Sequence, residues 1–183
     1  MNLANRISLF RIILVPCFVA SLVYYTPARD HIRYVSLAFL LVAIASDAVD
    51  GLVARSKRQQ SQLGAVLDPI ADKLLILSAL ISLSTIRALP DWMRIPAWFN
   101  LVVMSRDAII ITGTLLLFGF TGKLTVNPSR LGKWTIAAQM AVIVAVLLRF
   151  PLKIHLLLAT AVLTVASGLH YLRVGSRLLG PHG

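Results

Sequence analysis

The sequence contains one cysteine and few acidic residues. The single cysteine, Cys17, excludes an intramolecular disulfide, and its position inside an apolar segment favours a buried structural role. Only seven residues are acidic, all of them aspartates, against 18 lysines and arginines. The net charge of +11 is spread over many short segments and forms no basic domain, so nothing in the sequence indicates nucleic-acid binding.

Charged residues make up only 14% of the chain, whereas 58% of the residues are hydrophobic and the mean hydropathy is +0.83. These values exclude an ordinary soluble globular domain. A helix needs about 20 apolar residues to cross a bilayer, and such windows cover residues 7–25, 35–54, 63–85, 95–120, 131–148 and 152–172. We predict an all-α polytopic membrane protein with about six transmembrane helices, forming a single membrane domain over residues 1–183.

Lysines and arginines set the predicted orientation. With the N-terminus inside, ten of them fall in the inner segments and six in the outer ones. This excess identifies the inner side as the cytoplasmic side. The outer connection over residues 26–33 contains a proline and both signs of charge, and we expect it to be a solvated loop.

Segment 46–74 places four aspartates in otherwise apolar sequence. If the flanking windows are helical, Asp47 and Asp50 share a face at a spacing of three residues. Asp68 and Asp72 share a face at a spacing of four. The short basic loop between the windows makes the two helices antiparallel neighbours near the cytoplasmic surface. An uncompensated aspartate at a bilayer centre costs about 2.5–3.5 kcal/mol, so the carboxylates require cationic partners.

Two kinds of cation fit this cluster. Carboxylate oxygens without a nearby histidine or cysteine suit Mg²⁺ or Mn²⁺ rather than zinc, and facing pairs would hold two ions about 3.5–4 Å apart. The alternative is that nearby basic side chains, Arg55, Lys57 and Lys73, form ion pairs with the aspartates. Four carboxylates at these spacings favour the two-metal interpretation.

The same residues resemble a family signature. Asp47-x-x-Asp50-Gly51-x-x-Ala54-Arg55, followed after eight residues by Gly64-x-x-x-Asp68-x-x-x-Asp72, is similar in every defined position to the motif of the CDP-alcohol phosphotransferases (CDP-alcohol phosphatidyltransferases). Eight fixed residues at fixed gaps make a specific pattern. The six predicted spans and the cytoplasm-facing cluster, which do not depend on the motif, also fit that family.

The resemblance implies a role for each motif position. The four aspartates would bind a pair of divalent metal ions, and Asp72 would also be the catalytic base that takes the proton from the acceptor hydroxyl. Gly51, Ala54 and Gly64 lie where the family admits the cytidine nucleotide of the CDP-lipid. Arg55 lies where the family contacts the diphosphate.

Segments outside the motif indicate which branch of the family the chain resembles. The segment Pro128-Ser129-x-x-Gly132-Lys133 with Gln139, and the N-terminal residues Asn2, Ser8, Arg11 and Pro16, resemble phosphatidylglycerophosphate synthases. Those synthases usually have a lysine and a threonine where this chain has Thr135 and Ile136, and Ser105-Arg106-Asp107 is similar to cardiolipin synthases of the eukaryotic type. Glycerol 3-phosphate is therefore the leading acceptor, and phosphatidylglycerol is the alternative.

Arg106, Arg130 and Lys133 are the candidate acceptor ligands. An arginine in the middle of a membrane span is a functional candidate by default, although a structural ion pair with Asp107 is an alternative. Arg130 and Lys133 begin the fifth span on the predicted cytoplasmic side, behind Ser129 as a suitable N-cap. We expect these three basic residues to bind the phosphate of an anionic acceptor.

The resemblance thus implies an enzyme of phospholipid synthesis that transfers the phosphatidyl group of CDP-diacylglycerol to an alcohol, releases CMP and uses Mg²⁺ or Mn²⁺. It also implies a homodimer, and we expect the bacterial inner (cytoplasmic) membrane as its location, with the active site facing the cytoplasm. A divalent-cation transporter, with the aspartates as its ion site, is the alternative from another functional class. A transporter would be expected to have interrupted helices in two related halves, whereas this chain has one asymmetric cluster.

Overall fold

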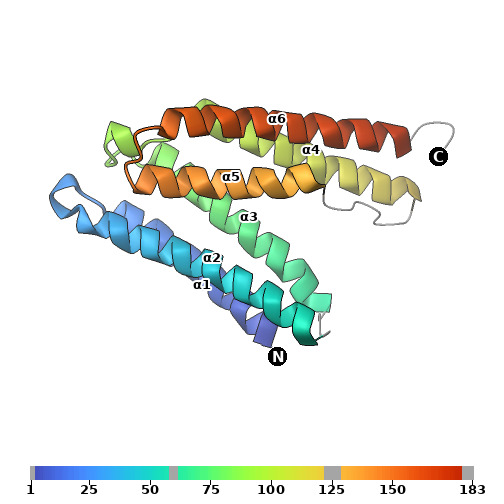
Figure 1. Cartoon of the computed structure of the whole chain (residues 1–183), viewed down its shortest axis with the longest axis horizontal. Helices are drawn as coiled ribbons and strands as arrows, with labels where there is room; N and C mark the ends of the chain where they lie inside the picture. Colours follow the sequence, from blue (N-terminus) through green and yellow to red (C-terminus); the bar gives the residue numbers. More distant parts are fainter. Residues whose placement is uncertain (1–2, 58–61, 122–128, 179–183) are drawn as a thin grey trace. The chain divides into compact units, whose positions relative to one another are not determined.

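The computed structural model describes residues 3–57, 62–121 and 129–178, with side chains described over 9–46, 70–116, 119 and 129–176. Within these ranges the protein is helical and has no strand. The helices are α1 (Leu3–Val23), α2 (His31–Lys57), α3 (Gln62–Thr85), α4 (Ala97–Thr121), α5 (Arg130–Leu147) and α6 (Lys153–Leu178), with short 3-10 helices η1 (Pro27–Arg29) and η2 (Asp91–Met93) (Figure 1). The all-α prediction is confirmed, and each predicted apolar window overlaps one helix.

The described helices have the length and composition of a membrane protein. Among the described residues, three segments are long and apolar enough to cross a bilayer, namely Asp91–Leu116, Arg130–Leu147 and Lys153–Ser176. Leu9–Val23 and His31–Ser46 are shorter apolar helical segments.

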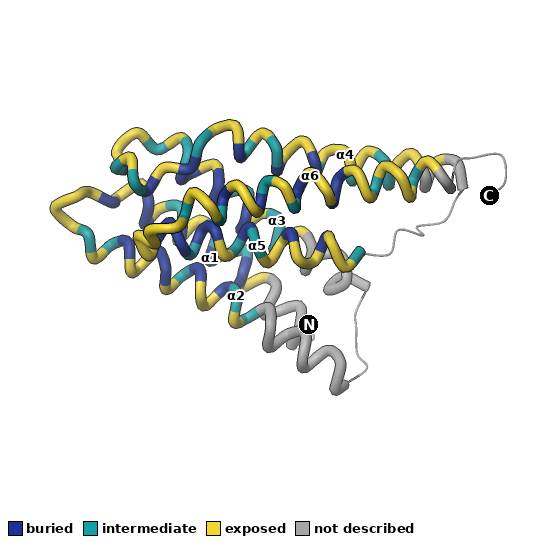
Figure 2. Tube along the Cα trace, turned by 45° about the horizontal axis from the view of Figure 1, so that its top comes forward, coloured by how far each residue is buried: buried dark blue, intermediate teal, exposed yellow. Residues whose placement is uncertain are grey.

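Large apolar side chains lie on the outside of the helices. Leu101, Leu115 and Val162 are each more than half exposed, with exposed fractions of 70%, 64% and 70%. Figure 2 shows exposed turns along much of α4 and α6. Because apolar surface of this extent is not left in water, it faces lipid, and the chain is an integral membrane protein.

The chain forms two compact units. Unit 1 comprises Met1–Ile95 with Val146–Arg149, and unit 2 comprises Pro96–Ala145 with Phe150–Gly183. In unit 1, α1 packs against both α2 and α3. In unit 2, α4 and α6 run side by side (Figure 1). The aspartate motif therefore belongs to unit 1, and the candidate acceptor ligands belong to unit 2.

One face of α1 forms the centre of unit 1. Its buried residues follow the helical repeat and are Arg11, Leu14, Phe18, Ser21 and Leu22. Cys17 lies beside this face and is exposed. The prediction of a buried Cys17 is wrong, because an apolar segment in a membrane protein has a lipid-facing side as well as a packed side.

The connection between α1 and α2 is only in part the solvated loop that the sequence predicts. The residues of η1 are exposed, but Arg33 is only 4% exposed. Its Nη1 donates to the carbonyl of Leu147 at 2.7 Å, and its Nη2 donates to Oδ2 of Asp30 at 3.0 Å. Arg33 thereby satisfies a backbone carbonyl at the C-terminal end of α5.

Asp30 is stabilised in its ionised form by these contacts. Burial raises the pKa of Asp30, but hydrogen bonds donated by Arg33 and Tyr25, together with the positive charges of Arg33 and Arg149, outweigh burial, and its pKa lies below the ordinary value. The contribution of Asp30 to stability is therefore present above its unfolded pKa of about 4 and is lost as the pH falls through the folded value.

Arg33→Met is expected to lower the stability of the fold. Removing a buried guanidinium that donates to a carbonyl and a carboxylate costs about 2–3 kcal/mol, so the melting temperature in detergent should fall by about 4–10 °C. Tryptophan fluorescence during heating measures this change. Arg29→Met, at an exposed arginine of η1, is the matched control. Equal melting temperatures for the two variants would contradict a structural role for Arg33.

Candidate active site

The aspartate motif lies on α2 and α3 at the predicted spacing. Asp47 and Asp50 are one turn apart within α2, and Asp68 and Asp72 are one turn apart within α3. The side chains of the first three lie outside the described residues, so the meeting of four carboxylates stays a prediction. The predicted CDP-lipid positions, Gly51, Ala54, Arg55 and Gly64, also have side-chain surroundings outside the described residues. Where side chains are described, no group of three or more potential metal ligands occurs.

Asp72 forms an ion pair with Arg11 of α1. Nη1 of Arg11 donates a hydrogen bond to Oδ1 of Asp72, and the two residues are 61 positions apart in the chain. The Arg11 side chain is fully buried, whereas 30% of the Asp72 side chain is exposed. The carboxylate is thus held from one side by a buried cation and stays accessible on another.

The pair of Arg11 with Asp72 was not predicted from the sequence. The basic residues nearest to the aspartates in the sequence, and therefore the predicted ion-pair partners, were Arg55, Lys57 and Lys73. The signal for Arg11 is its register with Leu14 and Phe18 on the buried face of α1, where an arginine requires an acidic partner.

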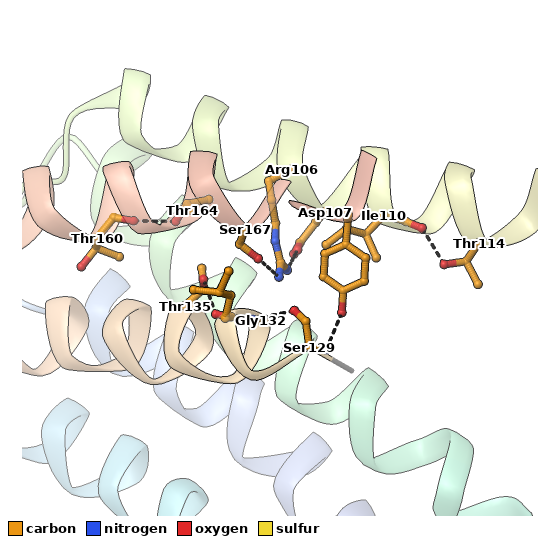
Figure 3. A network of polar contacts seen from close by, with 12 residues as sticks. Arg106, Asp107, Ile110, Thr114, Ser129, Gly132, Thr135, Thr160, Thr164 and Ser167 are labelled. Carbon is orange, nitrogen blue, oxygen red and sulfur yellow. Dashed lines mark hydrogen bonds and ion pairs between the residues drawn. The ribbon is translucent and has the colours of Figure 1, made fainter. Parts of the chain in front are cut away.

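Arg106 lies near the middle of α4 and is 7% exposed. Its Nη1 donates to Oδ1 of Asp107 at 2.8 Å, and its Nη2 donates to Oγ of Ser167 on α6 at 2.9 Å (Figure 3). Its Nε has no hydrogen-bond partner among the described residues. The ion pair with Asp107, which was the structural alternative to an acceptor-binding role, is therefore present, and the Nε of the guanidinium has donor capacity beyond it.

The first turn of α5 carries the other two candidate ligands. Arg130 and Lys133 are both exposed. Ser129 is the N-cap as predicted, because its Oγ accepts the Gly132 N–H at 3.0 Å. A Cβ atom placed on Gly132 would lie 3.2 Å from Nη2 of Arg106. Within unit 2, the structure thus brings Arg106 against the turn that carries Arg130 and Lys133.

Buried polar side chains extend away from Arg106 between the helices of unit 2. They are Thr135 and Gln139 on α5 and Thr160, Thr164 and Ser167 on α6, each at most 3% exposed. The hydroxyl of Thr135 donates to the Leu131 carbonyl at 2.8 Å, and that of Thr164 donates to the Thr160 carbonyl at 2.7 Å (Figure 3). Thr135 is therefore buried, with its hydroxyl bonded to the backbone of its own helix.

Ser167 and Tyr171 were not identified from the sequence. The guanidinium carbon of Arg106 lies 5.7 Å from the centroid of the Tyr171 ring, and the Tyr171 hydroxyl accepts the Ser129 N–H at 3.2 Å. Neither residue belongs to a motif. Their spacing of four residues, which puts both on one face of α6, is the signal that was available.

Comparison with known proteins identifies the family. The model of the CDP-alcohol phosphatidyltransferase family matches residues 1–167. A CDP-diacylglycerol–glycerol-3-phosphate 3-phosphatidyltransferase of Haemophilus influenzae is 33% identical over 180 residues, which cover 94% of this chain and 92% of that protein. Proteins of the same name from Bacillus subtilis and Escherichia coli are 34% and 33% identical, and the alignments cover 93% of both chains in each case. This chain belongs to the CDP-alcohol phosphatidyltransferase family.

Proposed function

We propose that the chain transfers the phosphatidyl group of CDP-diacylglycerol to glycerol 3-phosphate, giving phosphatidylglycerophosphate and CMP. One observation carries the proposal: relatives named for this activity align with the chain over 92–93% of their own length. The transferase class follows from the family. The relatives compared above are all named as transferases and give no support to a cation transporter.

Asp72 is the base in this proposal. The hydroxyl oxygen of the acceptor attacks the phosphorus of the diacylglycerol phosphate, and the bond from that phosphorus to the bridging oxygen breaks. CMP departs with the bridging oxygen, while the hydroxyl proton passes to the Asp72 carboxylate. Arg11 supports this role because it holds the carboxylate at a fixed position on α3.

The remaining motif residues bind the donor lipid. Gly51, Ala54 and Gly64 have little or no side chain, which leaves room for the planar cytosine beside a helix backbone. Arg55 contacts the diphosphate, for which a guanidinium is well suited because it donates two parallel hydrogen bonds.

The donor set fits Mg²⁺ or Mn²⁺. The four motif aspartates offer hard oxygen atoms only, two of them one turn apart on each of α2 and α3. Asp47, Asp50, Asp68 and Asp72 would hold a pair of ions. When bound, the ions would neutralise charge on the diphosphate as CMP leaves.

The acceptor phosphate binds at Arg106, Arg130 and Lys133. This proposal is supported by the approach of the α5 first turn to the Arg106 guanidinium. It is also supported by the Nε donor of Arg106, which has no partner among the described residues. A phosphate dianion matches a buried guanidinium that lies against a helix turn carrying two exposed cations.

We extend the proposal to the cellular location of the protein and to its assembly as a homodimer. The relatives compared above are bacterial proteins, and the excess of basic residues in the inner segments favours a site facing the cytoplasm from the inner membrane. The family match spans both units, which supports one functional domain over residues 1–183. The homodimer rests on the family resemblance alone.

We expect the protein to release CMP when glycerol 3-phosphate is the acceptor. We also expect this release to require a divalent ion. Purified protein is incubated with CDP-diacylglycerol and Mg²⁺, and CMP and lipid products are followed by mass spectrometry. EDTA should abolish release, and Mg²⁺ or Mn²⁺ should restore it.

Phosphatidylglycerol, supplied in place of glycerol 3-phosphate, tests the cardiolipin alternative. Cardiolipin as the product would replace the proposed acceptor but keep the reaction class. Full activity in EDTA would contradict the two-metal site. If no alcohol in a wide panel gave CMP, the transferase assignment itself would fail.

A further inference from the structure

Tyr171 of α6 is bonded to the backbone at the start of α5. Its hydroxyl accepts the Ser129 N–H at 3.2 Å, and the Ser129 carbonyl accepts the Lys133 N–H at 3.2 Å. The peptide backbone at Ser129 thus connects the Tyr171 hydroxyl to Lys133, which is one of the candidate acceptor ligands. Since Ser129 is also the N-cap, this bond fixes where α5 begins relative to α6.

The same tyrosine covers Arg106. The guanidinium carbon is 5.7 Å from the centroid of the Tyr171 ring, a distance at which a cation is attracted to the ring face. One turn earlier on α6, Oγ of Ser167 accepts a hydrogen bond from Nη2 of Arg106 at 2.9 Å (Figure 3). A single face of α6 therefore holds both Arg106 and the first turn of α5.

Gly132 shows how closely these groups converge. A Cβ atom at this position would lie 3.2 Å from Nη2 of Arg106, 3.3 Å from Oγ of Ser129 and 3.5 Å from Oη of Tyr171. The absence of a side chain at Gly132 lets the turn approach the guanidinium. Polar atoms of α4, of α6 and of the N-cap of α5 thus lie close to one backbone position.

We infer that Tyr171 is a positioning residue for the acceptor. It holds Arg106 and the α5 turn with Lys133 in the arrangement that receives the acceptor phosphate, and it acts through them without itself contacting the reacting atoms. The inference rests on the proposed function, because Arg106, Arg130 and Lys133 must be the phosphate ligands. Lys133 and Arg130 have long, exposed side chains, so their placement depends on a fixed backbone at the start of α5.

Tyr171→Phe is the test because it removes the hydroxyl and keeps the ring over Arg106. Losing one backbone hydrogen bond should raise the KM for glycerol 3-phosphate about three- to tenfold. The KM for CDP-diacylglycerol should stay within about twofold of the unmodified enzyme. CMP release with each substrate varied in turn gives both values. Tyr24→Phe, at a tyrosine that is 74% exposed, is the matched control and should change neither KM.

A double-variant cycle with Lys133→Ala separates positioning from general stabilisation. Once Lys133 is gone, Tyr171→Phe should raise the acceptor KM further by less than it does alone, because part of what it positions is missing. A lower melting temperature with an unchanged acceptor KM would mean that Tyr171 is only structural and would overturn the inference. Fully additive effects of the two substitutions would also overturn it.

The single variants distinguish failure of the inference about Tyr171 from failure of the proposed acceptor site. If Lys133→Ala and Arg106→Met raise the acceptor KM but Tyr171→Phe does not, the acceptor site stands and only the role of Tyr171 is refuted. If neither of those two variants changes the acceptor KM, the phosphate site itself is refuted, and the inference falls with it.

Discussion

Asp72→Asn is expected to lower turnover about 10²- to 10⁴-fold, the range typical for loss of a general base, while binding of CDP-diacylglycerol remains. Asparagine keeps the size of the side chain and an oxygen that accepts the hydrogen bond from Arg11. It has no carboxylate to take the proton of the acceptor. Turnover is measured by CMP release at saturating substrates, and binding of the donor lipid by calorimetry in detergent.

Loss of the ion pair is one competing explanation for a low turnover, beside loss of a proposed metal ligand. Arg11 is fully buried, and breaking a buried pair by removing one partner is costly. Arg11→Met disrupts the same pair but keeps the carboxylate, so it should destabilise the protein and retain much more turnover than Asp72→Asn. Asp91→Asn, at a side chain that is 97% exposed, is the matched control. If folded Asp72→Asn retained turnover within about fivefold of the unmodified enzyme, Asp72 would not be the base.

Local patterns account for what the sequence predicted correctly. Apolar windows of membrane-spanning length are properties of contiguous sequence, and each overlaps a helix in the structure. The spacing of Asp68 and Asp72 places them one turn apart in α3 for the same reason. Ser129 was recognisable as an N-cap because a hydroxyl before a helix start satisfies a free N–H of the first turn.

Contacts between distant segments were not predictable in this way. Arg11 pairs with Asp72 across 61 positions, and Arg33 donates to Leu147 across 114. A hydropathy pattern shows that a buried arginine needs a partner but does not say which helix supplies it. The error at Cys17 has a related cause. The lipid-facing and packed sides of a membrane helix are about equally apolar, so hydropathy alone does not separate them.

Arg106→Met is expected to weaken use of glycerol 3-phosphate more than any other substitution in unit 2. Removing a buried cation that binds a phosphate should cost about 2–4 kcal/mol, roughly a 30- to 1000-fold loss in kcat/KM for the acceptor. The KM for CDP-diacylglycerol should change little. Steady-state CMP release with glycerol 3-phosphate varied at saturating donor gives this ratio.

The competing explanation is that Arg106 serves only to join α4 to α6 through Ser167 and to pair with Asp107. Arg33 provides the comparison, because it is also a buried arginine, at 4% exposed against 7% for Arg106, and its contacts cap a helix end. Arg33→Met should lower the melting temperature and leave the acceptor KM unchanged. A purely structural Arg106 would behave in the same way when replaced by methionine.

The double variant Arg106→Met with Asp107→Leu then separates stability from acceptor binding. Methionine alone leaves the Asp107 carboxylate, which is 14% exposed, without the guanidinium that now contacts it. Replacing both partners by apolar side chains removes that penalty and should restore much of the melting temperature. Acceptor binding should not recover, because the phosphate has still lost its cation. Recovery of both properties together would show that Arg106 acts through the fold and not on the substrate.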